Sequence, residues 1–363
     1  MTESITCRHF FDGHHLLGPH RIIFNDGVIE VIEPFSGEPD HYLVGPGLVD
    51  IQMNGFESVD VARATSDELQ QLGERLAALG TTSWLATITT APLDVLSQSI
   101  EKISAAIDND SAVGCAGLHI EGPFLGNAPG AHRPDWIIPF DSDWVSQLPS
   151  SVRLMTIASE QPNVASAVRA LREKHIAVSI GHSRPTDGQW NDARGAGASL
   201  VTHLFNGMSG VHHRDNGLAL QALTDDEVYA GIIGDMIHVS PQAVNLAFRA
   251  KGGARMCLVS DSVGWQTSWA QKRNIQVSDG APRLPDGTLA GSSTSLAECL
   301  RRVVHEAKVS LVEALRSATS SPSAAIGANN AGHVTLGEEA DLVAFDDSLH
   351  VVSTWRRLVS LRG

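Results

Sequence analysis

Hydrophobic residues in the middle of the chain form short, strand-length runs that alternate with longer segments of helical periodicity. In the segment SDELQQLGERLAALG, for example, Leu69, Leu72, Leu76 and Leu79 fall on one face of a helix. Such alternation is typical of a parallel sheet with covering helices. The strand-length runs occupy residues 47–52, 83–89, 116–121, 153–158, 176–182, 199–205, 229–235 and 256–261. Eight such units predict an α/β protein with a (β/α)8 barrel over residues 47–332.

The two ends of the chain have a different pattern. Short Val- and Ile-rich runs separated by Gly and Asn-Asp-Gly turns occur both in FDGHHLLGPHRIIFNDGVIEVIEP and in AGHVTLGEEADLVAFDDSLHVVSTWRR. This pattern is typical of small antiparallel strands. We therefore expect residues 1–46 and 333–363 to combine into one small β-sandwich domain.

Composition excludes several classes of partner. A formal net charge of -15 and a pI near 5.4 disfavour binding to nucleic acid or anionic lipid, so an anionic substrate needs a local cluster of positive groups. There is no apolar run long enough for a membrane span, and the N-terminus lacks the features of a signal peptide. We expect a cytoplasmic protein. The widely spaced Cys7, Cys115, Cys257 and Cys299 argue against disulfides and against a thiolate metal site.

Polar residues close most of the predicted barrel strands. They are Gln52 and Asn54 (first strand), His119 and Glu121 (third), His182 (fifth), His203 (sixth), Asp235 and His238 (seventh) and Asp261 (eighth). Any one of them alone is more often a structural residue that caps the next helix. In a barrel, however, the carboxyl ends of all the strands meet at one mouth. The set therefore predicts an active site.

One carboxylate and two imidazoles from this set suit a catalytic divalent ion. Glu121, His182 and His203 would supply three ligands and leave coordination positions open for water and substrate. Asp261, from the last strand, would accept a proton from the attacking water and return it to the leaving group. These residues predict a metal-dependent hydrolase.

The motifs at these positions occur in a specific order. They are PGLVDIQMNG, GLHIEGPF, GAH, IGHS, THLFNGM, GDMIHV, LVSDSV, LAGSS and a closing G-x-x-ADLVAFD. Over nearly its full length the chain resembles the N-acetylglucosamine-6-phosphate deacetylases of the amidohydrolase superfamily. The resemblance implies hydrolysis of the N-acetyl group of N-acetylglucosamine 6-phosphate to glucosamine 6-phosphate and acetate. It also implies a homodimer.

The resemblance assigns a role to each matching residue. Glu121, His182 and His203 would bind one divalent metal ion, with zinc favoured and iron, cobalt or manganese as alternatives. Asp261 would be the general acid and base, and His132 of GAH would be a catalytic residue that polarises the acetamide. The substrate-binding residues would be His132, His238, the backbone amides of Asn206 and Gly207, and Arg214. The Arg214 loop can reach across a dimer interface in this family, so that Arg214 would clamp the phosphate in its own or the partner subunit.

Gln52 and Asn54 occupy the two positions where many amidohydrolases carry a His-x-His pair. An amide oxygen is a far weaker zinc ligand than imidazole. We therefore expect a vestigial second metal site, one metal ion per chain, and amides that form hydrogen bonds within the site.

There are three alternatives to this assignment: a different sugar substrate, a non-catalytic binding protein and a different class of hydrolase. The sequence around Arg214 reads GVHHRDNG, and the residues after Arg214 depart from the usual Glu-Pro-Gly, so N-acetylgalactosamine 6-phosphate stays open as an alternative substrate. A non-catalytic sugar-phosphate-binding relative is a second alternative, against which the intact set of polar residues argues. A Ser-His-Asp hydrolase is disfavoured because no GxSxG sequence follows a predicted strand.

Overall fold

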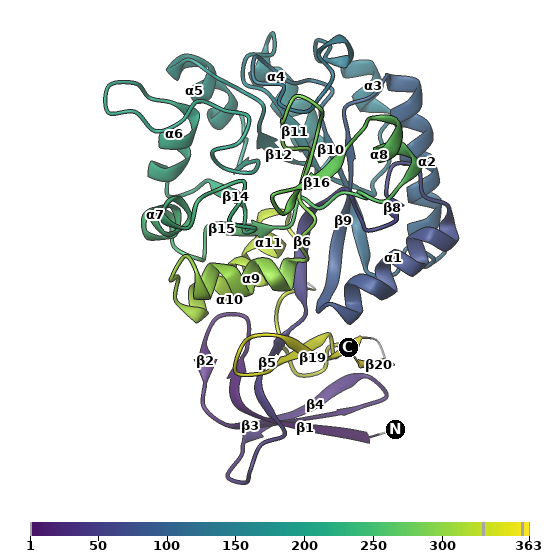
Figure 1. Ribbon diagram of the computed structural model, residues 1–363, viewed down its shortest axis with the longest axis vertical. Helices are drawn as coiled ribbons and strands as arrows, with labels where there is room; N and C mark the ends of the chain where they lie inside the picture. Colours follow the sequence, from purple (N-terminus) through teal and green to yellow (C-terminus); the bar gives the residue numbers. More distant parts are fainter. Residues whose placement is uncertain (1, 329–330, 357–358, 363) are drawn as a thin grey trace.

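The protein consists of a parallel barrel covered by helices and a small β-domain below it (Figure 1). The computed structural model describes residues 2–328, 331–356 and 359–362. Residues 1, 329, 330, 357, 358 and 363 of the predicted domains lie outside the described residues.

The barrel is formed by eight parallel strands in the order β15-β14-β13-β12-β11-β10-β9-β6. Their bounds are β6 (Leu48–Met53), β9 (Thr81–Thr89), β10 (Cys115–Glu121), β11 (Val152–Ile157), β12 (Ala177–Ile180), β13 (Leu200–Val201), β14 (Tyr229–Ile233) and β15 (Met256–Val259). The first and last strands meet just beyond their ends, where the amide of Asp261 donates to the carbonyl of Gln52 (2.9 Å) and the amide of Asn54 donates to that of Ser262 (2.8 Å). The predicted barrel fold is confirmed.

Helices surround the barrel strands, and the longer ones are amphipathic. They are α1 (Ser66–Ala78), α2 (Leu93–Asp108), α3 (Ser142–Ser146), α4 (Val164–Glu173), α5 (Asp187–Gly195), α6 (Leu218–Thr224), α7 (Pro241–Lys251), α9 (Leu296–His305), α10 (Leu311–Ser317) and α11 (Ser320–Ala325). In α1, Thr65 forms a capping box with Glu68, while Leu69, Leu72 and Leu76 are buried as their spacing predicts.

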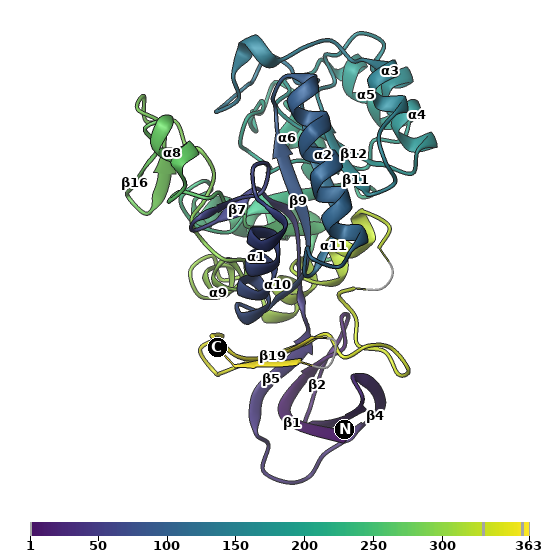
Figure 2. The same cartoon turned by 90° about the vertical axis from the view of Figure 1, so that its right-hand side faces the viewer.

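Short elements lie over the carboxyl ends of the barrel strands. They are the pair β7 (Gly55–Phe56) and β8 (Val59–Asp60), the short helix α8 (Ser268–Lys272), the pair β16 (Gln276–Ser278) and β17 (Ala281–Arg283), and a 3-10 turn at Pro134–Trp136. Figure 2 shows α8 and β16 projecting to one side of the barrel. These elements border the mouth of the barrel.

The small β-domain takes its strands from both ends of the chain. They are β1 (Thr2–Phe11), β2 (Leu16–Leu17), β3 (His20–Asn25), β4 (Val28–Pro34), β5 (His41–Pro46), β18 (Leu342–Phe345), β19 (Val351–Arg356) and β20 (Val359–Arg362). β18 pairs with β5, which joins the two ends, and Phe10, Ile22 and Trp355 pack in the core. A separate β-domain is thus confirmed, while its boundaries at residues 46 and 333 stay a prediction.

Two further observations bear on the sequence-based expectations. No helix in the described part of the chain has the length and hydropathy of a membrane span. All four cysteines are free thiols.

Candidate active site

Three of the predicted site residues, each two residues beyond the end of a barrel strand, have left-handed backbone. The φ angles are 49° at His182, 29° at His203 and 47° at Asp261, just after β12, β13 and β15. Left-handed backbone is uncommon for residues other than glycine and costs roughly 1–2 kcal/mol per residue. The chain therefore turns sharply where each strand ends, and all three side chains line one cavity at the mouth. Such strain is typical of functional sites.

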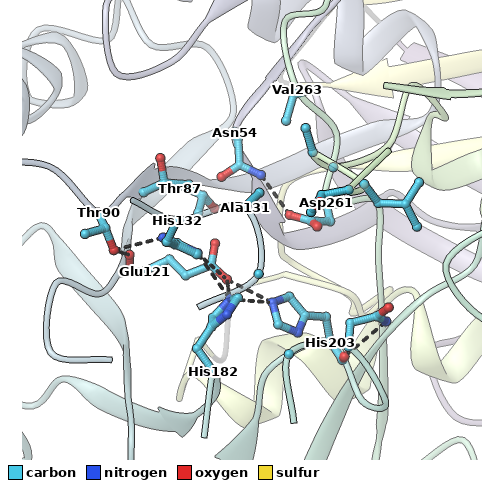
Figure 3. A pocket seen from close by; sticks show the side chains of 18 of the residues that line it. Asn54, Thr87, Thr90, Glu121, Ala131, His132, His182, His203, Asp261 and Val263 are labelled. Atoms are coloured by element: carbon cyan, nitrogen blue, oxygen red, sulfur yellow. Dashed lines mark hydrogen bonds and ion pairs between the residues drawn. The ribbon is translucent and has the colours of Figure 1, made fainter. Parts of the chain in front are cut away.

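Glu121, His182 and His203 converge at the floor of this cavity (Figure 3). Glu121 Oε1 lies 3.1 Å from His182 Nε2 and 3.0 Å from His203 Nε2, and the two nitrogens lie 3.1 Å apart. All three side chains are at least 93% buried, with exposed fractions of 3%, 7% and 6%. Ligands of a tetrahedral zinc, about 2.0–2.2 Å from the ion, lie roughly 3.3 Å apart, so the triangle is close to that size.

Hydrogen bonding around the triangle fits a cation at its centre. His182 Nδ1 lies 2.9 Å from the carbonyl of Ala128 and therefore donates, which leaves Nε2 as the lone-pair atom of the neutral ring. That lone pair faces the oxygen of Glu121. His203 Nδ1 is buried and has no hydrogen-bond partner among the described residues. Two acceptors in van der Waals contact require a proton or a metal ion between them, and the donor set of one carboxylate and two imidazoles suits a divalent metal.

The pKa shifts of Glu121 and His203 also fit a cation within the triangle. Burial by itself would raise the pKa of Glu121, but the neighbouring His182 and His203 hold it well below its ordinary value. Burial by itself would lower the pKa of His203, but the Glu121 and Asp261 carboxylates raise it. The Glu121 and Asp261 carboxylates therefore favour a positive charge at the centre of the triangle.

His132 lies beside the triangle. Its Nε2 is 3.2 Å from His182 Nε2, and its Nδ1 is 2.9 Å from the hydroxyl of Thr90. Potential ligand atoms of Glu121, His132 and His182 lie within 4.8 Å of one another. Burial and the neighbouring His182 lower the pKa of His132 to about 3, so its ring is neutral. Thr90, which orients this ring, has no signal in the sequence beyond its place after a strand.

Asp261 faces the triangle from the other side of the cavity. Its Oδ1 accepts hydrogen bonds from Asn54 Nδ2 (2.8 Å) and Gln52 Nε2 (3.2 Å), and the same Gln52 nitrogen lies 3.3 Å from Glu121 Oε1. The two amides thus form hydrogen bonds within the site. Burial and the charge of Glu121 raise the pKa of Asp261 to about 6. A carboxylate with this pKa is suited to exchange protons near neutral pH.

The cavity has a volume of about 250 Å³, which suits a small molecule rather than a polymer. Asn206, Gly207 and His238 line it beside β13 and β14. His238 Nδ1 is held by Asp235 Oδ2 at 2.6 Å, which leaves Nε2 available to a ligand.

Arg214 is not brought to the cavity of its own chain. It lies in an exposed loop with His212 and His213 and is absent from the residues that line the cavity. His119 also lies away from the cavity, in the barrel interior, where it contacts the hydroxyls of Thr87 and Thr156.

Cations of the cavity rim come instead from residues that sequence reasoning missed. Arg63, Arg133 and Arg273 line it together with Trp136 and Trp269. Arg133 directly follows the GAH motif, whereas Arg63 and Arg273 lie outside the motifs, and no signal in the sequence singles them out.

Comparison with known proteins accounts for this arrangement. Residues 43–359 match the Amidohydrolase family. The chain belongs to the amidohydrolase family. This amidohydrolase is 32% identical to the N-acetylglucosamine-6-phosphate deacetylase of Bacillus subtilis, with 91% of this chain and 89% of that protein covered. It is 30% identical to the N-acetylgalactosamine-6-phosphate deacetylase of Escherichia coli O157:H7, with 98% of both proteins covered.

Solved structures agree with these relatives. The N-acetylglucosamine-6-phosphate deacetylase of Thermotoga maritima superimposes with a TM-score of 0.91 at 25% identity, covering 99% of this chain and 100% of that one. An Asp-to-Ala mutant of the enzyme from Mycobacterium smegmatis, in complex with N-acetyl-D-glucosamine-6-phosphate, also gives 0.91 at 25% identity over 100% of both chains. The family predicted from the ordered motifs is confirmed.

Proposed function

We propose that this amidohydrolase hydrolyses the N-acetyl group of N-acetylglucosamine 6-phosphate to glucosamine 6-phosphate and acetate. The observation that carries the proposal is the position of Asp261 opposite the Glu121, His182 and His203 triangle across one small cavity. Such a pairing of a metal-type donor set with a proton-accepting carboxylate suits hydrolysis of an amide. The names of the B. subtilis, T. maritima and M. smegmatis relatives support the substrate.

Glu121, His182 and His203 would hold one divalent metal ion, for which zinc is the best candidate on ligand type. The bound ion would act as a Lewis acid toward the acetyl carbonyl. The amides of Gln52 and Asn54, which already bond to Asp261 and Glu121, offer little to a second ion.

Asp261 would move the protons of the reaction. As a carboxylate it takes a proton from the attacking water, and as an acid it returns that proton to the nitrogen when the C–N bond breaks. Its raised pKa places both protonation states within reach near neutral pH.

The remaining residues would bind and orient the substrate. His132, fixed by Thr90, would contact the acetamide oxygen. His238 and the backbone amides of Asn206 and Gly207 would contact the phosphate end of the sugar. Arg214 would join them from a second copy of the chain in a homodimer, which accords with its exposure. A cytoplasmic location would follow from a role in amino-sugar metabolism.

N-acetylgalactosamine 6-phosphate is a second candidate substrate. It is supported by the E. coli relative, whose name specifies that sugar, and the departure from the usual sequence after Arg214 leaves it open. The two sugars differ only in the configuration at one ring carbon, so both would place the acetamide at the triangle.

Acetate release from the two N-acetylhexosamine 6-phosphates and from unphosphorylated N-acetylglucosamine tests the proposal. Metal content should be measured on the same preparation. We expect fastest release from N-acetylglucosamine 6-phosphate and about one metal ion per chain. Preference for the galacto epimer would select the second substrate. No release by the metal-loaded protein from any of the three would overturn the proposal and favour a non-catalytic sugar-phosphate-binding protein.

A further inference from the structure

Glu160 lies beyond the carboxyl end of the fourth barrel strand, β11, and has no part in the reaction described above. It is half-buried and is absent from the residues that line the active-site cavity. Its carboxylate nevertheless accepts hydrogen bonds from two loops. Oε1 accepts from the backbone amides of Arg184 (2.6 Å) and Asn127 (3.4 Å), and Oε2 accepts from the hydroxyl of Ser183. The side chain therefore joins loops that follow two different strands.

One of these loops is the sharp turn that carries His182. Ser183 and Arg184 directly follow this proposed metal ligand, whose backbone is left-handed. Glu160 holds both of them, one through its side chain and the other through its amide. The amide of Ser159 also donates to Ser183 Oγ (3.2 Å). The backbone after His182 is therefore fixed against the segment that follows β11.

The other loop follows β10 and makes two contacts with His182. The amide of Gly126 donates to the carbonyl of His182 (3.0 Å), and the carbonyl of Ala128 accepts from His182 Nδ1 (2.9 Å). Asn127, between these two residues in the sequence, donates its amide to Glu160. The carboxylate therefore holds the loop at the same point where the loop holds His182.

The loop comes close to the carboxylate because residue 126 is a glycine. A Cβ at Gly126 would lie 2.7 Å from Glu160 Oε1 and 2.9 Å from Ala158 Cβ, which is too close for either contact. The same loop continues to His132, whose Nε2 lies 3.2 Å from His182 Nε2 (Figure 3). A shift of this loop would therefore displace His132 and remove the hydrogen bond of His182 Nδ1 together.

We propose that Glu160 is a positioning residue that fixes His182 and His132 by clamping the loop after β10 to the turn after β12. The inference rests on the proposed function, because it gives Glu160 a role in metal binding and in orienting the acetamide. The bond from His182 Nδ1 to the Ala128 carbonyl sets the tautomer that leaves Nε2 as the ligand atom. A carboxylate suits this task, since hydrogen bonds to an ionised acceptor are stronger than those between neutral groups.

A purely structural role for Glu160 is the alternative. In that case its removal lowers the stability of the fold but leaves the site of the folded, metal-loaded protein unchanged. A positioning role instead changes metal affinity and turnover at temperatures where the variant is fully folded. Measurements well below the melting temperature therefore separate the two roles.

The test compares Glu160→Ala and Glu160→Gln with Glu173→Ala. Glu173 is an exposed carboxylate at the end of α4, the helix that follows the same strand, and it does not line the cavity. Glu160→Gln keeps an oxygen that can accept from the two backbone amides, so it should rescue part of the loss. The zinc affinity of the metal-free protein is measured by calorimetric titration in competition with a chelator, and circular dichroism shows whether each variant is folded.

Zinc affinity should fall about 10–100-fold in Glu160→Ala, the usual effect of removing a group that orients a metal ligand. Glu160→Gln should be intermediate and Glu173→Ala unchanged. Unchanged zinc affinity in folded Glu160→Ala would overturn the role of Glu160 in holding His182, and so would a wild type that binds no zinc. This readout needs no substrate. If no sugar releases acetate but zinc affinity depends on Glu160, the deacetylase assignment fails and the positioning role stands.

Turnover at saturating zinc tests the link from Glu160 to His132. Glu160→Ala should lower kcat for N-acetylglucosamine 6-phosphate about tenfold or more, because His132 is no longer held against the acetamide. In a His132→Ala background the loss should be at least about threefold smaller, since the residue through which Glu160 acts is gone. Equal losses in the two backgrounds would show that Glu160 acts independently of His132 and would overturn this part of the proposal.

Discussion

Asn54 and Asp261 join the first and last strands of the barrel through a side-chain hydrogen bond of 2.8 Å from Nδ2 to Oδ1. Backbone hydrogen bonds flank this contact, because the amide of Asn54 donates to Ser262 and that of Asp261 donates to Gln52. The place where the barrel closes is therefore also the place where the proposed base is held. Barrel closure and the proposed proton transfer therefore involve the same residues.

The Asn54 bond makes the pH dependence of activity testable. It stabilises the charged form of Asp261 and so lowers the pKa of that carboxyl, which burial has raised. Because the proposed reaction begins with the carboxylate, kcat/KM should rise with pH through the pKa of Asp261. Asn54→Ala removes the bond, and the acid limb of the pH profile should move to higher pH. A bound metal ion lowers the pKa of Asp261 in both the wild type and Asn54→Ala. The prediction therefore concerns the difference between the two acid limbs and not their absolute position. An acid limb at the same pH in the two proteins would contradict it.

Asp261→Asn tests the role of the carboxylate more directly. The amide keeps the shape of the side chain but cannot accept the water proton, so turnover should fall by about 10²–10⁴-fold or more. Metal content, measured by elemental analysis, should stay at the wild-type value because Asp261 is not among the proposed ligands. As a control, Asp286→Asn changes an exposed carboxylate outside the cavity and should leave turnover unaltered. Near-normal turnover of Asp261→Asn would remove the residue from the mechanism.

The sequence predicts the fold well because barrel strands and amphipathic helices leave strong periodic signals. It overestimates strand length, as at residues 199–205, where only Leu200 and Val201 form β13. The run looks continuous because hydrophobicity carries no information about the left-handed turn at His203. The residues Glu121, His182, His203 and Asp261 were nevertheless found, since each closes or follows a strand and the topology brings all such positions together.

What the sequence does not predict lies in loops. Arg63 and Arg273 are far apart in the sequence. Both contact the Trp269 ring because the segments after β8 and β15 fold over the mouth of the barrel. No periodicity or motif encodes that contact. Conversely, Arg214 stands in a recognisable position, yet one chain alone leaves it exposed. Loop cations therefore need the three-dimensional structure to be assigned.

Gly181 tests how tightly the metal-type triangle is supported. A Cβ at this position would lie 2.7 Å from Thr156 Cγ2 and 2.8 Å from Thr202 Cβ, both inside the barrel. Gly181→Ala should lower the free energy of unfolding by about 1–3 kcal/mol and, by shifting the adjacent His182, weaken metal binding. Thermal melting with and without added metal measures both effects. The control is Gly188→Ala in α5, where a Cβ meets no atom within 4 Å and should be neutral or stabilising. Equal melting temperatures for the two variants would show that the barrel accommodates the methyl group.

Gln52 and Asn54 explain why one metal ion per chain is expected, and their replacement should change that number. Gln52 Nε2 lies within 3.3 Å of both Glu121 Oε1 and Asp261 Oδ1, so the amide nitrogen occupies a point between two carboxylates. Two imidazoles placed here by Gln52→His combined with Asn54→His would join those carboxylates in a second donor set. Metal content should rise from about one to about two ions per chain. Gln52→Glu is the matched control for added ligand charge without imidazole, and it should bind less of the second ion than the double variant. If the double variant still holds one ion, the geometry of the strand-end turn, rather than the identity of residues 52 and 54, limits the site to a single metal.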